Sequence, residues 1–121
     1  MKIVTGGSTA DGYGAHFNGR AELEMLDLSD NADRPDTALG HFHDGTVTNW
    51  HSHPGGQHLW LVSGRGRIGT DGEPEAVIEP GTLVIAPADE RHWHGAATGA
   101  DAHWLTLTWG TTAWEDREGG A

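Results

Sequence analysis

Two short stretches of this chain concentrate side chains of the kinds that bind metal ions, and the first begins at residue 51. His51 and His53 are two residues apart, and on a β-strand this spacing puts both imidazole rings on the same face. The Pro-Gly-Gly at 54–56 then forces a turn, so Gln57 can point back toward the same space. Two imidazoles and one amide oxygen would give an ion three ligands from a single short segment.

The second stretch, "RHWHG" at 91–95, repeats this spacing with His92 and His94, which are the candidates for a fourth ligand. Neutral imidazole is the commonest protein ligand for transition metals and suits Zn, Fe, Mn, Ni or Cu. A single His-x-His pair can equally lie on an exposed strand face. The presence of a second pair, also bordered by turn residues, favours a metal site.

The segments that must position these residues have the pattern of short β-strands. The chain holds 19 glycines and 5 prolines, which divide it into short pieces, and no stretch keeps an apolar period of 3.6 residues over ten positions or more. Many short strands with frequent turn signals indicate an all-β sandwich or barrel, and a closed barrel can bring distant strands together on its axis. The predicted strands are 21–28, 37–43, 57–63, 66–70, 75–79, 82–86 and 102–109.

The length of 121 residues fits a single domain spanning 1–121. We predict a core over about 21–110, preceded by an N-terminal arm at 1–20 that is rich in glycine and polar residues. The C-terminal tail at 111–121 ends in "WEDREGGA" (114–121), which is charged and Gly-rich, so we expect these last residues to fray.

Composition excludes several classes of function. The chain has no cysteine, which excludes disulfides and thiolate chemistry. Its net charge of −11 would repel nucleic acid and anionic membranes. We find no apolar run long enough for a transmembrane helix and no apolar signal segment at the start. The default expectation is therefore a cytoplasmic protein that acts on a small molecule.

The stretch "GTVTNWHSHPGGQHLWLVSG" resembles the first motif of the cupin family, in which a Gly is followed by His-x-His, then a carboxylate, then another Gly. The residues that occupy these places in order are Gly45, His51, His53, Gln57 and Gly64. The glutamine therefore stands where the motif more often has a carboxylate.

The later stretch "GTLVIAPADERHWHGA" resembles the second cupin motif through Gly81, Pro87 and His92. It departs from that motif at Asp89, where the motif has Gly, and at Ala96, where it often has Asn. Together the two resemblances cover residues 45–96. They imply a small cupin-type β-barrel, also called a double-stranded β-helix or jelly roll.

"WHSHPGGQ" followed by "HWHGA" resembles more narrowly a bacterial subgroup of single-domain cupins that includes manganese-dependent hydroxynitrile lyases. The resemblance implies a metal site made of His51, His53, Gln57 and His92. It implies manganese first, with iron, zinc or nickel as alternatives. Thr48 beside the metal, His94 as a nearby base and His103 on the last strand are the further residues it suggests for catalysis.

The glutamine has a consequence that depends only on its charge. Three neutral imidazoles and a neutral amide would leave the full +2 charge of a divalent ion uncompensated, whereas a carboxylate would reduce it. Such a site should hold its metal less tightly but act as a stronger Lewis acid. His94 shares a strand face with His92, so it should lie close enough to a bound substrate to accept a proton.

The alternation along 102–109 places His103 on the same face as Leu105 and Leu107, and we predict that this face points inward. If Phe42 lines the barrel, His41 and His43 lie outside it. The same alternation puts Trp50 and Trp93 away from the metal, and His58 outward.

The function that this reading favours is a metal-dependent lyase acting on a small organic molecule, with cyanohydrin cleavage and formation as the specific activity suggested by the resemblance. Three alternatives stay open. They are an Fe(II)-dependent dioxygenase, a Zn-dependent cyclase or isomerase, and a non-catalytic metabolite-binding protein. The many aromatic residues, together with the resemblance, favour a homodimer or larger homo-oligomer.

Overall fold

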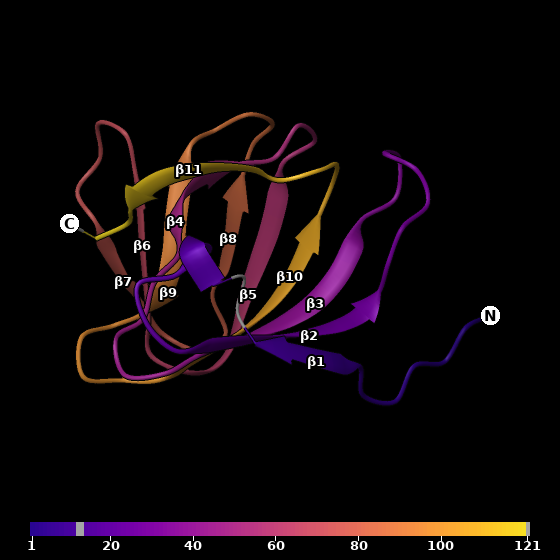
Figure 1. Cartoon of the computed structure of the whole chain (residues 1–121), viewed down its shortest axis with the longest axis horizontal. Helices are drawn as coiled ribbons and strands as arrows, with labels where there is room; N and C mark the ends of the chain where they lie inside the picture. The colour runs from indigo at the N-terminus through magenta and orange to yellow at the C-terminus, as the bar shows by residue number, and fades with distance from the viewer. Residues whose placement is uncertain (12–13, 121) are drawn as a thin grey trace.

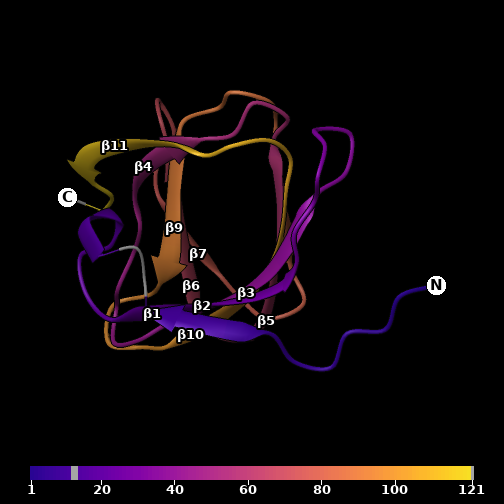
Figure 2. The same ribbon diagram turned by 45° about the vertical axis from the view of Figure 1, so that its right-hand side comes forward.

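The computed structural model describes residues 1–11 and 14–120, which form two antiparallel β-sheets that face each other. Figure 1 shows the sheets on either side of a common interior, and Figure 2 shows β4, β9 and β6 across that interior from β3 and β5. The larger sheet has the order β1 (Ser8–Asp11), β2 (Ala21–Asp27), β3 (Asp36–Phe42), β10 (Ala102–Thr108), β5 (Gln57–Gly64) and β8 (Leu83–Ala86).

The smaller sheet carries both His-x-His segments. Its order is β11 (Ala113–Glu118), β4 (Asn49–Ser52), β9 (His92–Ala96), β6 (Gly66–Thr70) and β7 (Ala76–Ile78). The short 3-10 helix η1 (Gly14–His16) lies against β11. Nothing helical in the described residues is long and apolar enough to cross a membrane.

The all-β prediction is confirmed, and each predicted strand is present with both ends within one residue of the expected position. The turns between strands explain this accuracy. Glycines with positive φ, such as Gly64 and Gly81, end or begin these segments, because side chains other than glycine rarely adopt that conformation. At Gly64 an added Cβ would also come within 2.1 Å of the Asp101 carbonyl oxygen.

The interior is filled by large side chains from β3, β5 and β10 of the larger sheet, namely Phe42, Leu59, Leu61 and Trp104. Trp104 is fully buried, and its indole N–H donates a hydrogen bond to the Gly95 carbonyl at 3.0 Å. The barrel interior thus contains an aromatic core packed against the strand that carries His92 and His94.

The predicted inward face of β10 is wrong. Ala102, Trp104 and Thr106 are buried in the barrel, whereas His103 and Leu105 lie on the opposite face. Both faces of this strand carry large apolar residues, so their alternation does not identify the inner one. Trp104 occupies the interior because Gly66 leaves it room: a Cβ at Gly66 would come within 2.5 Å of the indole.

The expected orientation of the other aromatic residues is confirmed. Phe42 is buried, while His41 and His43 on either side of it are partly exposed. Trp50 and Trp93 pack away from the barrel interior, each beneath an arginine guanidinium. Arg91 lies 4.8 Å from the Trp50 ring centroid, and Arg67 lies 5.2 Å from that of Trp93.

Both terminal segments contain strands that we did not predict. Residues of β1 pair with β2, with Ser8 opposite Met25. Residues 113–118 of the C-terminal tail do not fray, because they form β11 beside β4 (Figure 1), and Ala121 lies outside the described residues. One of the tail charges that suggested a solvated segment, Glu115, is paired: the Arg91 guanidinium donates to both of its carboxylate oxygens, at 2.7 and 2.8 Å.

Candidate metal centre

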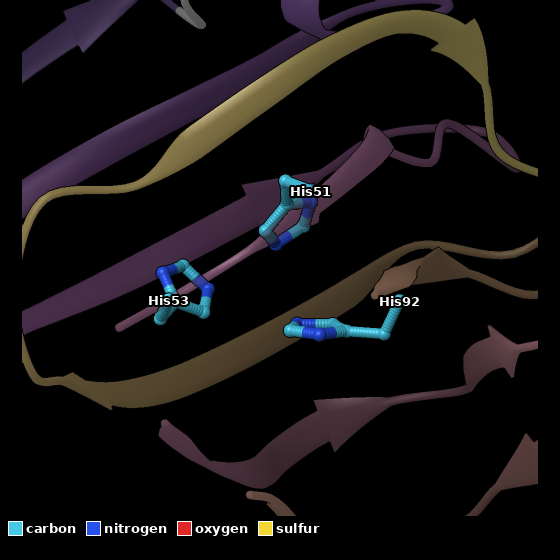
Figure 3. A group of neighbouring side chains, drawn as sticks. All are labelled: His51, His53 and His92. Carbon is cyan, nitrogen blue, oxygen red and sulfur yellow. The ribbon is translucent and has the colours of Figure 1, made fainter. Parts of the chain in front are cut away.

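Three histidines from β4, its following turn and β9 come together inside the barrel. His51 lies directly opposite His92 in the pairing of these two strands, and His53 comes just after the end of β4. One ring nitrogen from each residue lies within 4.8 Å of the others, and all three side chains are buried. Figure 3 shows the three rings gathered around one space.

The hydrogen bonds of two of these rings leave Nε2 free to bind an ion. His51 donates from Nδ1 to the Asn49 carbonyl oxygen at 2.9 Å, and His92 donates from Nδ1 to the Glu90 carbonyl oxygen at 3.1 Å. A carbonyl oxygen only accepts hydrogen bonds, so the proton of each neutral ring is on Nδ1. The Nε2 lone pair is then the one available to a metal.

The third ring has a nitrogen with no partner. Nδ1 of His53 lies 3.1 Å from the Thr112 hydroxyl oxygen. Its Nε2 is buried and, within the part of the chain that the structure describes, has no hydrogen-bond partner. Leaving a buried polar atom unsatisfied costs about 1–3 kcal/mol, so an orphaned atom of this kind indicates a missing ligand.

Gln57, at the start of β5, completes the donor set. Its Nε2 donates to the Thr108 hydroxyl oxygen at 2.8 Å, which turns Oε1 to within 3.0 Å of His92 Nε2. Because the His92 proton is on Nδ1, two lone pairs face each other across this short distance. A cation between them would convert this repulsion into two ligand bonds. The arrangement therefore fits a divalent ion held by three imidazole nitrogens and one amide oxygen.

Burial keeps these imidazoles in the neutral state that metal binding requires. Burial, reinforced by the neighbouring His92 ring, lowers the pKa of His51 well below its ordinary value. Burial likewise lowers the pKa of His53 to about 4 and also lowers the pKa of His92. At neutral pH all three rings therefore carry a lone pair.

His94 lies on the same face of β9 as His92, and its ring is packed edge-on between Phe42 and Trp104 at centroid distances of 5.4 and 5.8 Å. Burial is the main cause that lowers the pKa of His94 well below its ordinary value, and the nearby His51 ring adds to it. Its Nδ1 is buried without a hydrogen-bond partner among the described residues. Thr48 is also buried, and its hydroxyl oxygen accepts the backbone N–H of His94 at 3.2 Å.

A cavity of about 100 Å³ lies beside this cluster and is lined by His51, His53, Gln57, His94 and Thr48. Apolar side chains complete its walls, among them Phe17, Leu23, Met25, Phe42 and Trp114. Over the described residues its lining includes one carboxylate, Asp36, and no lysine or arginine. Because its walls are mostly apolar and this lining has no cationic side chain, the space suits a small neutral molecule.

Residues 38–108, which carry most of these features, match the family model of the cupin domain. The chain belongs to the cupin family. It is 36% identical over 104 residues to an (R)-mandelonitrile lyase from Granulicella tundricola, and the match covers 80% of this chain and 76% of that protein. The expected likeness to hydroxynitrile lyase-like cupins is thereby confirmed.

Solved structures show the same fold. A cupin-like protein from Thermotoga maritima superposes with a TM-score of 0.82 and 27% identity, covering all of both chains. A predicted oxalate decarboxylase from the same organism has a TM-score of 0.75 and 18% identity over 91% of this chain and all of that one. At 18% identity, the second match supports the fold and no particular activity, because cupins of one fold host unrelated chemistries.

The suggested placement of His103 in the catalytic cavity is wrong. This residue lies on the outer face of β10, opposite His41 of β3, and the two Nδ1 atoms are 2.8 Å apart. It does not belong to the cavity lining, where its strand contributes Thr106 and Thr108 instead. The cause is the reversed face of β10 described above.

Two residues at the site were missed by sequence reasoning. Thr112 contacts His53, and Trp114 lies over His51 with ring centroids 4.6 Å apart. Both come from the predicted C-terminal tail, and Trp114 begins the stretch that we expected to fray. The available signal was the spacing of Thr112 and Trp114 in an otherwise charged tail. Residues two apart on a strand present their side chains to the same face.

Proposed function

We propose that this cupin binds a divalent transition metal through His51, His53, Gln57 and His92, and that it acts as a lyase on a small neutral molecule. Manganese is the first candidate for the ion, with iron, zinc or nickel as alternatives. The observation that carries the proposal is the set of buried donors with no proton between them, above all the 3.0 Å approach of Gln57 Oε1 to His92 Nε2. The similarity to an (R)-mandelonitrile lyase supports the reaction class.

When bound, the ion would supply Lewis-acid stabilisation to an oxygen of the substrate, undiminished by any charged ligand. His94 would act as the base. Its lowered pKa keeps the ring neutral at pH 7, and its unpartnered Nδ1 leaves one nitrogen free to take a proton. The Thr48 hydroxyl oxygen already accepts a backbone N–H, so its own hydrogen is free to be donated to a substrate oxygen.

We propose cyanohydrin cleavage and its reverse as the specific reaction. In cleavage, the hydroxyl proton passes to His94 as the carbon–cyanide bond breaks. The O–H electron pair becomes the second bond of the carbonyl, and the electrons of the broken carbon–carbon bond leave with cyanide. His94 then returns the proton to give hydrogen cyanide. The apolar walls, Phe42 and Trp114 among them, would hold the organic group of the substrate.

The test is to purify the protein, measure its metal content by elemental analysis, and assay cyanide release from mandelonitrile with and without O₂. We expect about one equivalent of metal after loading and equal rates in air and under argon. Less than a tenth of an equivalent after loading would overturn the metal site. Bound metal without cyanide release would overturn the cyanohydrin reaction, and turnover that consumes O₂ would indicate an oxygenase instead.

We also propose that the protein is a homodimer that associates through the outer face of the larger sheet. Trp60, Val62, Leu83 and Ile85 on β5 and β8 are 41%, 49%, 48% and 60% exposed. Trp60 lies directly opposite Leu83 in the strand pairing, so these side chains form one patch. Contiguous exposed apolar surface is typical of an interface. The cytoplasmic location stays a prediction from the sequence.

A further inference from the structure

We infer that the C-terminal segment Thr112–Trp114 is part of the metal centre, with Thr112 and Trp114 as positioning residues for His53 and His51. The segment lies beyond residues 38–108, the part of the chain that matches the cupin family model. The inference rests on the proposed metal site, because the histidines it positions are the proposed ligands.

Thr112 fixes the state of His53. Its hydroxyl oxygen lies 3.1 Å from His53 Nδ1. His51 and His92 each donate to a backbone carbonyl oxygen instead, and among the described residues no carbonyl oxygen does this for His53. When the hydroxyl accepts the Nδ1 proton, the buried Nε2 is left with its lone pair facing the cluster. A threonine from outside the two cupin motifs thus does for His53 what the backbone does for the other two ligands.

Trp114 covers the ring of His51. The two residues lie directly opposite each other in the pairing of β11 with β4, and their ring centroids are 4.6 Å apart at an interplanar angle of 41°. The indole is also stacked on His16 of η1, with ring centroids 4.3 Å apart at an interplanar angle of 15°. Trp114 therefore packs against two rings, and it both limits the rotation of His51 and forms a wall of the cavity.

The segment is anchored firmly enough for this role. Three residues before the segment, Trp109 accepts the backbone N–H of Gly55 at its carbonyl oxygen at 3.0 Å. The backbone N–H of Trp109 in turn donates to the Gly56 carbonyl oxygen at 3.1 Å. The glycine is needed there, since a Cβ at Gly55 would come within 2.5 Å of the Trp109 Cβ. Beyond the segment, the backbone N–H of Gly119 donates to the Thr48 carbonyl oxygen at 3.1 Å. The same turn that separates His53 from Gln57 therefore also clamps the chain that leads to Thr112.

The test measures metal affinity directly, by competition of Mn²⁺ and of Zn²⁺ against a chromophoric chelator. Thr112→Val keeps the size of the side chain but removes the hydroxyl, and Thr112→Ser keeps the hydroxyl. The exposed neighbour provides a matched control, Thr111→Val. Removal of a group that orients a metal-binding histidine typically weakens binding about 10–100-fold. We expect that loss for Thr112→Val, and wild-type affinity within about threefold for the other two variants.

The indole is tested by fluorescence as well as affinity. Because its ring lies against His51, Trp114 should give the largest share of the quenching that Co²⁺ causes on binding. Trp114→Phe should lose that share, and Trp60→Phe on the outer sheet face should keep it. Trp114→Leu should also bind Mn²⁺ about tenfold more weakly. Thermal unfolding of each metal-free variant checks that it folds.

The possible failures are distinguishable. A wild-type protein that binds neither Mn²⁺ nor Zn²⁺ would overturn the metal site itself, and with it the proposed function. A wild-type protein that binds metal, with Thr112→Val binding it equally well, would overturn the role of Thr112. Unchanged quenching in Trp114→Phe would overturn the placement of the indole beside the ion.

Discussion

The stability of the metal-free protein should fall steeply with acid, because several histidines must be neutral to remain buried. The perturbation is to remove metal with a chelator and lower the pH from 8 to 4. A histidine whose pKa is lowered by folding binds protons more readily in the unfolded chain. Stability from such a group is fully present above its unfolded pKa and is lost as the pH falls toward its folded pKa.

His53 gives the magnitude, because its side chain is 3% exposed and its pKa is lowered from the ordinary 6.5 to about 4. The difference of about 2.5 pH units is worth about 3 kcal/mol, at about 1.36 kcal/mol for each pH unit. This stability should be present above pH 6.5 and absent below about pH 4. His51, His92 and His94 change stability in the same direction, since burial lowers the pKa of each.

The assay is urea unfolding followed by circular dichroism at intervals between pH 8 and pH 4, for the metal-free wild type and for His53→Asn. The slope of unfolding free energy against pH is the measurement, because the absolute stability also changes with the substitution. His53→Asn should reduce the total loss between these limits by about 3 kcal/mol. An identical slope in the wild type and His53→Asn would refute the reasoning.

Four further substitutions test separate parts of the site and the surface. Gln57→Glu places a carboxylate beside the proposed ion and should raise Mn²⁺ affinity about tenfold in chelator competition while lowering turnover of mandelonitrile; equal or weaker binding would contradict the charge argument. His94→Gln should lower kcat by about 10²–10⁴ with metal affinity within about threefold of wild type, as expected for loss of a base; retained turnover would exclude that role. His103→Gln should leave kcat and KM unchanged, because the side chain lies outside the cavity; a loss of kcat alone would place it back in the reaction. Ile85→Lys should convert the dimer to a monomer in analytical ultracentrifugation, since it puts a charge into an apolar patch that is 60% exposed at this position; a wild-type monomer would exclude the interface.

The strands were predictable because their ends are set locally. Positive-φ glycines such as Gly64 and Gly81 lie where the sequence pattern already indicated turns. The proximity of His51, His53 and Gln57 was predictable for a related reason, whereas His92 was assigned to the site by the cupin resemblance. The His-x-His spacing fixes one strand face, and the turn at 54–56 fixes where the chain returns. These are short-range constraints, and they survive into the structure without help from distant residues.

The errors arose where a distant residue decides the outcome. The inner face of β10 depends on whether the indole of Trp104 or the side chains of Leu105 and Leu107 fill the interior. Gly66 on another strand bears on that choice, because its missing side chain leaves room for the indole. The C-terminal strand likewise makes its contacts with other segments of the chain, as in the Arg91–Glu115 ion pair. Local composition gives no sign of either partnership.

The neutral ligand set also bears on how so acidic a protein would stabilise negative charge. The chain carries a net charge of −11, and the cavity lining over the described residues includes a carboxylate but no lysine or arginine. An anionic substrate would therefore be repelled at long range and would find no cationic side chain in the cavity. A neutral substrate that develops negative charge on one oxygen during the reaction needs only one positive group, at the site of that oxygen. In the proposed site, the neutral Gln57 would leave the positive charge of the metal ion undiminished, where a carboxylate would reduce it. This favours reactions that pass through an alkoxide or a leaving cyanide over reactions that begin from a dianion.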